Sequence, residues 1–168
     1  MFRILVILSI AFAFLAGCSK ETHKIQLPEE MPEDFRFSIS FGYGEDHKNE
    51  INTYNGTITK DLVTKGTASA ALTFSNDELK TIYGKMKDIA ILDEKQFPQK
   101  GNCSQTPSST DSWKITVNGE TKILSWTNEY CDMTKDANDL LELRSYIQKI
   151  VEEKDAYKAL PAAEGGYD

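Results

Sequence analysis

Strict alternation of apolar and polar side chains between residues 35 and 43 is the feature that most constrains the fold of this chain. Its apolar members are Phe35, Phe37, Ile39, Phe41 and Tyr43. Because successive side chains of a strand point to opposite faces, this period of two predicts a strand that is buried on one face only. Such strands are typical of an antiparallel sheet that has its core on one side.

Two further segments before residue 75 favour β-structure. Thr53–Val63 is rich in threonine, and residues 68–74 alternate again after a turn at Lys65-Gly66. The charged stretch between residues 44 and 50 is expected to be a loop. Together these segments predict a three-stranded antiparallel meander.

The chain changes to helical periodicity at Ser75. Ser75 is a good N-cap, and Glu78, three residues later, completes a capping box. Apolar residues then recur at intervals of three and four, which predicts one stripe packed on the sheet, formed by Leu79, Ile82, Tyr83, Met86 and Ile89.

Asn118-Gly119 lies between two β-prone segments and predicts a hairpin. The register of this hairpin is left open by the sequence. A two-residue turn pairs Ile115 with Lys122, whereas a three-residue loop pairs Ile115 with Ile123, which buries more apolar surface.

These elements predict one α+β domain over residues 35–156. The expected architecture is an antiparallel sheet in the order β-β-β-α-β-β-α, with two helices on one face and the last helix over residues 136–154. Residues 157–168 contain a Leu-Pro pair and a Gly-Gly pair, so they are expected to form a tail that is either loosely docked or without fixed structure.

The N-terminus carries a different kind of signal. Arg3 precedes the apolar run Ile4–Phe14, which is shorter than the about 20 residues that a membrane span needs. The four residues that follow resemble a lipobox, the motif at which bacteria attach diacylglycerol to a cysteine and cleave before it: Leu15-Ala16-Gly17-Cys18. Residues 1–17 are therefore expected to be a signal peptide, and residues 18–34 a polar tether.

Together with the capped helix, the Asn-Gly hairpin and the closing helix, this N-terminus resembles small lipoproteins of Gram-positive bacteria. The resemblance implies that Cys18 bears an S-diacylglycerol and that its new amino group is a site for a further acyl chain such as palmitate. Two or three acyl chains on one cysteine make a durable anchor. The expected location is the extracytoplasmic face of the cell membrane, with the membrane as a partner through Cys18.

Cys103 and Cys131 are the two cysteines left once Cys18 carries lipid. An even pair in an extracytoplasmic protein predicts a disulfide. Metal binding is the poorer interpretation, because the chain has only two histidines, His23 and His47. No metal and no cofactor are expected.

The sequence offers little for catalysis. His47 lies in the charged loop and is best interpreted as a solvated side chain. Alternating oxygen-bearing residues at 132–138 resemble a calcium loop, but the turn glycine is missing and Leu143 stands where a bidentate glutamate belongs. Capping of the last helix is the better interpretation. Nucleic acid is not an expected partner, because 26 acidic against 19 basic residues give a net charge of −7.

Three aromatic residues gather around the hairpin and the cysteines: Trp113, Trp126 and Tyr130. They indicate either a recognition surface for a protein, peptide or glycan, or simple packing beside a disulfide. The function predicted is that of a non-catalytic binding or envelope accessory protein. The alternatives are a hydrolase-type enzyme of the cell envelope, with a carboxylate site that the sequence does not identify, and a structural spacer.

Overall fold

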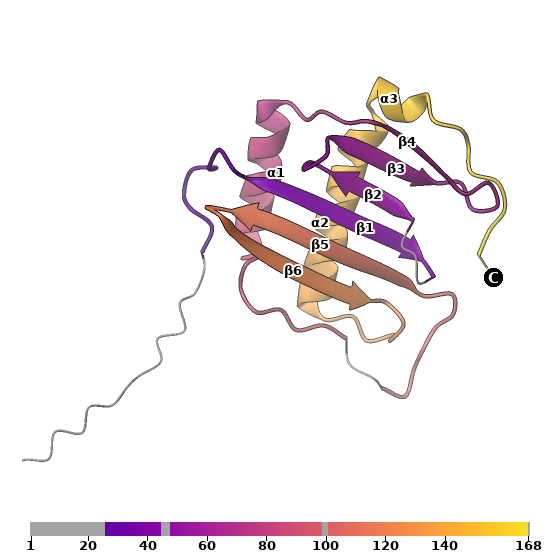
Figure 1. The fold of residues 1–168 in the computed structure, drawn as a ribbon. Helices are drawn as coiled ribbons and strands as arrows, with labels where there is room; N and C mark the ends of the chain where they lie inside the picture. The colour runs from indigo at the N-terminus through magenta and orange to yellow at the C-terminus, as the bar shows by residue number, and fades with distance from the viewer. Residues whose placement is uncertain (1–25, 45–47, 99–100, 168) are drawn as a thin grey trace, which may run out of the picture.

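A computed structural model describes residues 26–44, 48–98 and 101–167 of the 168-residue chain. Within these ranges the chain forms an α+β fold, with one six-stranded antiparallel sheet and three helices (Figure 1). The elements in chain order are β1 (Arg36–Tyr43), β2 (Asn49–Asn52), β3 (Thr57–Asp61), β4 (Thr67–Ala71), α1 (Asn76–Asp88), β5 (Ser109–Val117), β6 (Glu120–Thr127), α2 (Lys135–Glu152) and α3 (Asp155–Lys158).

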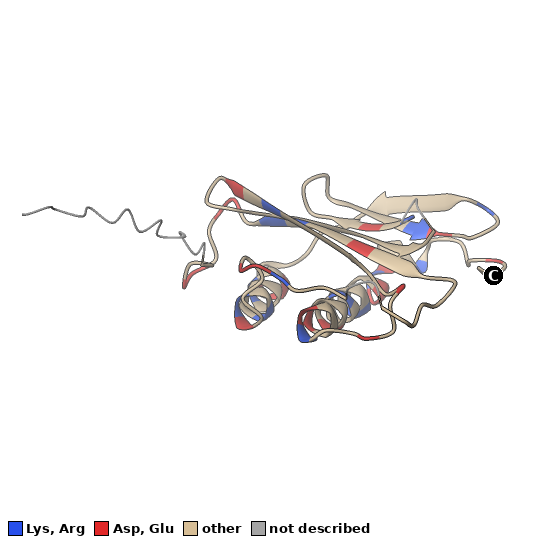
Figure 2. Cartoon of the chain, turned by 90° about the horizontal axis from the view of Figure 1, so that it is seen from below, with Lys and Arg blue, Asp and Glu red and all other residues tan. Residues whose placement is uncertain are grey.

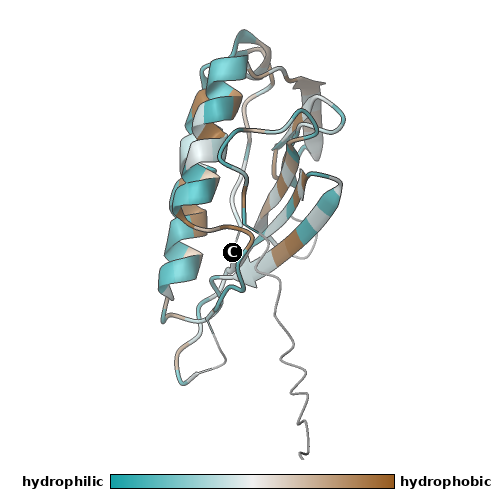
Figure 3. Ribbon diagram, turned by 90° about the vertical axis from the view of Figure 1, so that its left-hand side faces the viewer, coloured by the Kyte–Doolittle hydropathy of each residue, from teal (hydrophilic) through white to brown (hydrophobic). Residues whose placement is uncertain are grey.

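The strands are ordered β4-β3-β2-β1-β5-β6, so the strand with the strict alternation lies inside the sheet, between β2 and β5. Phe37 and Ile39 are fully buried, whereas the serines between the apolar residues are half-exposed. Figure 2 shows α1 and α2 on one side of the sheet, and in Figure 3 hydrophobic and hydrophilic residues alternate along the strands. The predicted one-sided burial of this sheet is confirmed.

The sheet has one strand more than the sequence predicts. The additional strand is β2, which begins inside the stretch of residues 44–50 expected to be a loop, so that prediction is wrong for Asn49 and Glu50. Residues 53–56, expected as the start of a strand, form the turn between β2 and β3. Asn52 Oδ1 accepts hydrogen bonds from the backbone N–H groups of Tyr54 and Asn55, at 2.9 and 3.1 Å. Gly56 then adopts a φ of 62°, which costs glycine little. An asparagine side chain that mimics a backbone turn therefore holds residues 53–56 in a turn, although the threonines of this segment favour a strand.

The predicted N-terminus of α1 is confirmed. The Glu78 backbone N–H donates to Ser75 Oγ at 3.2 Å, and the Ser75 N–H donates to Glu78 Oε2 at 2.7 Å, which is a complete capping box. Ile82, Tyr83 and Met86 form the buried stripe of this helix against the sheet.

The structure decides the hairpin register in favour of the two-residue turn. Asn118 and Gly119 both have positive φ, 51° and 77°, as a type I′ turn requires. Ile115 therefore lies opposite Lys122, and Ile123 is left 71% exposed. The turn geometry outweighs the apolar burial, and the Lys122 ammonium keeps hydrogen-bond partners, since it donates to two backbone carbonyls after α1 at 3.1 and 3.3 Å.

The packed body extends beyond the domain limits expected from the sequence. Leu27, inside the expected tether, is only 9% exposed and belongs to the hydrophobic core, and the Tyr83 hydroxyl donates to the carbonyl of Pro28 at 2.7 Å. At the other end, α3 follows α2, and the Tyr167 hydroxyl donates to the Asp61 carboxylate. The body therefore runs from residue 27 to residue 167, because both flanking segments have docking partners on the sheet or on α1.

Candidate binding surface

The predicted disulfide is confirmed. Cys103 and Cys131 are bonded, with their Cα atoms 5.6 Å apart. The bond joins the segment before β5 to the segment after β6, where a bridge between Ser104 and Tyr130 also connects them. Cys18 and His47 lie outside the described residues.

The interpretation of the tryptophans as a recognition surface is wrong. Trp113 and Trp126 are only 1% and 5% exposed, and both belong to the hydrophobic core. Trp113 shares its parity with the buried Ile115 along β5, so it points to the helix-covered face of the sheet. Neither indole N–H has a hydrogen-bond partner among the described residues. The packing interpretation therefore holds for the two tryptophans, and Tyr130 is half-buried beside the disulfide.

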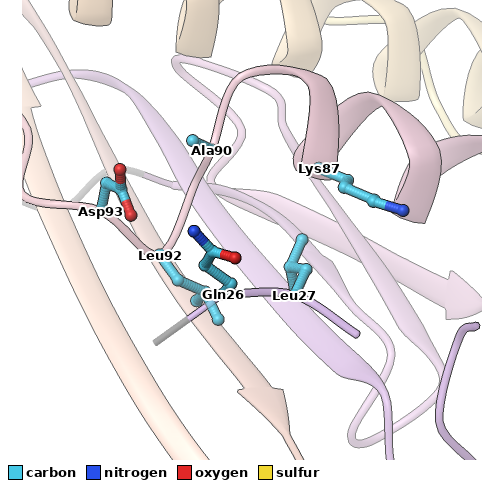
Figure 4. Close-up of a pocket in the computed structure, with 6 residues that line it drawn as sticks. All are labelled: Gln26, Leu27, Lys87, Ala90, Leu92 and Asp93. Carbon is cyan, nitrogen blue, oxygen red and sulfur yellow. The ribbon is translucent and has the colours of Figure 1, made fainter. Parts of the chain in front are cut away.

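The hollow shown in Figure 4 lies between the end of α1 and the first described residues. It holds about 210 Å³ and is lined by Gln26, Leu27, Lys87, Ala90, Leu92 and Asp93. Lys87 and Asp93 stand on opposite sides of it in this view, and Lys87 is paired with the Glu29 carboxylate. The lining of this hollow is therefore mainly apolar, with one charged side chain on either side. It does not place a nucleophile beside a base, as covalent catalysis would require.

The calcium-loop pattern at residues 132–138 is explained by helix capping. The Ala137 N–H donates to Thr134 Oγ1 at 3.2 Å, so Thr134 is the N-cap of α2. Burial raises the pKa of Asp136, but hydrogen bonds from the Gln96 N–H (2.8 Å) and from Lys95 (3.3 Å) outweigh it and leave that pKa below its usual value. No group of three potential metal ligands comes together in the described ranges.

The sheet face opposite the helices is covered by no helix of the described residues, and we call it the open face. Its side chains are the outward members of each strand, and most of them carry a hydroxyl group. The open face is formed by Arg36, Ser38, Ser40, Glu50, Thr57, Thr59, Ser69, Thr110, Ser112, Lys114, Thr116, Thr121, Ile123, Ser125 and Thr127. The sequence carries a signal for it, since the polar members of the alternating segments are mainly serine and threonine.

Six of these side chains form a continuous row of cross-strand neighbours over all six strands, and we call it the hydroxyl row, although one member is Glu50. Each member is the direct cross-strand partner of the next, in the order Ser69, Thr59, Glu50, Ser40, Ser112 and Ser125. Since neighbouring strands lie about 4.8 Å apart, the row is about 24 Å long. Hydroxyl groups also pair within it, Thr59 with Ser69 at 2.9 Å and Ser112 with Ser125 at 3.0 Å.

One corner of the open face carries an aromatic ring and two cations. The Tyr54 hydroxyl is hydrogen-bonded to Thr116 Oγ1 at 2.8 Å, which holds the ring on the sheet. Lys114 Nζ lies 4.7 Å from the centroid of this ring. Arg36 and Lys114 are both exposed. The open face is therefore locally cationic at this corner, although the chain as a whole is acidic.

No protein-family model, curated protein or solved structure matches this chain. Among the described residues, none of the helices combines the length and the apolar character needed to cross a membrane.

Proposed function

We propose that this protein is a lipid-anchored binding protein of the cell envelope and that the open face is its binding surface. The observation that carries the proposal is the contrast between the two faces of the sheet. The core and both long helices lie on one face, while the other presents rows of short polar side chains outward.

Binding fits this arrangement better than catalysis does. Catalysis needs a nucleophile and a base that converge on one reacting atom. The open face instead spreads its hydroxyl groups along rows at the spacing of the strands. Groups arranged in this way suit an extended partner that makes many weak contacts. The hydrolase alternative has no comparable observation in its favour.

The anchor is the second part of the proposal, and it rests on the sequence. The motif that ends at Cys18 resembles a lipobox. The first described residues lie at the end of the sheet where β6 begins (Figure 1). An acylated Cys18 would therefore tether the body from this end.

Replacement of the anchor cysteine tests the location. We expect Cys18→Ala to lose its acyl chains and to leave the membrane fraction, as measured by fractionation of the native host and by mass spectrometry of the purified chain. A variant that is still processed and still sediments with the membrane would contradict the anchor.

Obstruction of the open face tests the binding surface. The detergent-solubilised full chain is mixed with washed envelopes of its host, and the fraction that pellets is measured. We expect Ser112→Arg, inside the hydroxyl row on β5, to pellet several-fold less than the unaltered chain. Thr81→Arg is the matched control, because Thr81 is an exposed residue of α1, in the helix layer. Equal pelleting of both variants would remove the open face from the proposal.

A further inference from the structure

The hydroxyl row places polar side chains at a regular repeat across the sheet. Its members succeed one another at the strand spacing of about 4.8 Å, because each is the register partner of the next. One pyranose unit of an extended β-linked glycan advances that polymer by nearly the same distance. A glycan lying across the strands would therefore place about one sugar on each strand over a short stretch of the row.

The chemistry of the row also matches a sugar polymer. A hydroxyl group has one donor and two acceptor sites. In the Ser112–Ser125 pair one hydrogen is used between the two oxygens, so the pair retains one O–H donor and free lone pairs for a ligand. Sugar hydroxyls need both donors and acceptors, and closely spaced serine pairs offer both.

A protein partner fits this surface less well. The buried centre of a protein interface is enriched in aromatic residues, methionine and arginine, and it is depleted in serine. The row contains only hydroxyl side chains and Glu50, and the exposed aliphatic residue Ile123 lies at the edge of the sheet on β6. Few apolar groups on this face would gain from being buried.

Charge narrows the class of glycan. Arg36 and Lys114 are exposed on the open face, while Glu50 accepts a hydrogen bond from Asn52 Nδ2 at 3.1 Å. Two cations against one carboxylate suit a neutral or weakly acidic sugar polymer. On the basis of the proposed function, we infer that the ligand of the open face is an extended β-linked glycan, bound across the strands along the hydroxyl row.

The probe is insoluble chitin, a β-linked polymer of N-acetylglucosamine, and starch granules are the comparison, because their α-linked chains coil. The detergent-solubilised full chain is pelleted with each, and a soluble N-acetylglucosamine hexamer is used as competitor. We expect the chain to pellet with chitin and the soluble hexamer to displace it. With starch, no more protein should pellet than in a sample without polysaccharide.

Two neighbouring hydroxyl groups inside the row are then removed. Ser40→Val combined with Ser112→Val keeps side chains that strands favour. Because two hydrogen-bonding groups are lost, we expect chitin binding about ten-fold weaker. Thr81→Val on α1 is the matched control and should bind as the unaltered chain does. If the valine variant unfolds at a lower temperature, Ser112→Ala combined with Ser125→Ala repeats the test with a smaller change of shape.

Three results would overturn the inference: equal binding of starch and chitin, unchanged chitin binding in folded row variants, or equal loss in the Thr81→Val control. Absence of chitin binding, while Ser112→Arg still prevents pelleting with envelopes, would reject the β-linked glycan and leave the proposed function standing. If chitin binding is absent and Ser112→Arg also fails to reduce pelleting with envelopes, the open face is rejected as the binding surface.

Discussion

Removal of the Cys103–Cys131 disulfide should weaken the fold by an amount that follows from its position in the chain. The two cysteines are 28 residues apart. In the chain-entropy model, closing a loop of this length stabilises the folded state by about 3.6 kcal/mol, because the bond restricts the unfolded chain. Both cysteines are exposed, so their replacement by alanine removes little packing.

The folded variant should keep the geometry around the missing bond. The Gln105 N–H donates to the Glu129 carbonyl at 2.8 Å, and Ser104 bridges Tyr130, so the two segments remain connected without the sulfur atoms. The loss of unfolding free energy should therefore arise from the greater freedom of the unfolded chain. We expect Cys103→Ala combined with Cys131→Ala to keep the circular dichroism spectrum of the unaltered chain.

The measurement is urea unfolding of the full chain in detergent, at neutral pH and without reductant, followed by thermal unfolding. For a chain of this size about 3.6 kcal/mol corresponds to a lowering of Tm by about 7–14 °C. The unaltered chain in excess reductant is the control and should shift by a similar amount. A loss below about 1 kcal/mol in the double variant would refute the reasoning, since it would mean that the bond does not restrict the unfolded chain.

Three further changes test the packing of the helices. Ser75→Ala should cost about 1 kcal/mol of unfolding free energy, whereas Ser75→Gly should cost only a few tenths, as measured by urea unfolding. Arg144→Met should cost about 3 kcal/mol, because Arg144 Nε lies 2.6 Å from Oδ2 of Asp111, which is 2% exposed, and Asp111→Leu in the same chain should recover most of the loss. Burial raises the pKa of Glu78, but hydrogen bonds from Lys154 and Ser75 outweigh it and lower that pKa below 4.5. Its contribution is therefore present above about pH 4.5 and lost as the solution becomes acidic enough to protonate the folded form, so Glu78→Gln should destabilise the chain more at pH 7 than at pH 3. Equal effects at both pH values would contradict this.

Much of the local structure could be predicted from the sequence because its signals are short-range. The alternation at residues 35–43 reports which side chains of β1 are buried, and Ser75 with Glu78 defines the start of α1 within three residues. The cysteine pair predicts a covalent bond without any knowledge of the strands, since compartment and count suffice.

The turn after Asn52 and the docking of Leu27 were not predicted. The Asn52 side chain forms a turn at the start of a segment whose threonines favour a strand, and a lone leucine inside a polar stretch carries no periodic signal. Both depend on where a single side chain finds a partner. Likewise, the aromatic residues around the hairpin were readable as either core or surface until their parity along β5 and β6 was known.

The sequence by itself determined the alternation of β1, the capping of α1 and the disulfide, because each of these depends on residues near in the chain or on chemistry alone. Only the tertiary structure aligned Ser40 of β1 with Glu50 of β2 and with Ser112 of β5, since that register joins residues up to 72 positions apart. A slip of one residue in either pairing would turn the serines toward the core. The open face is therefore a property of long-range pairing, and so is any function that depends on it.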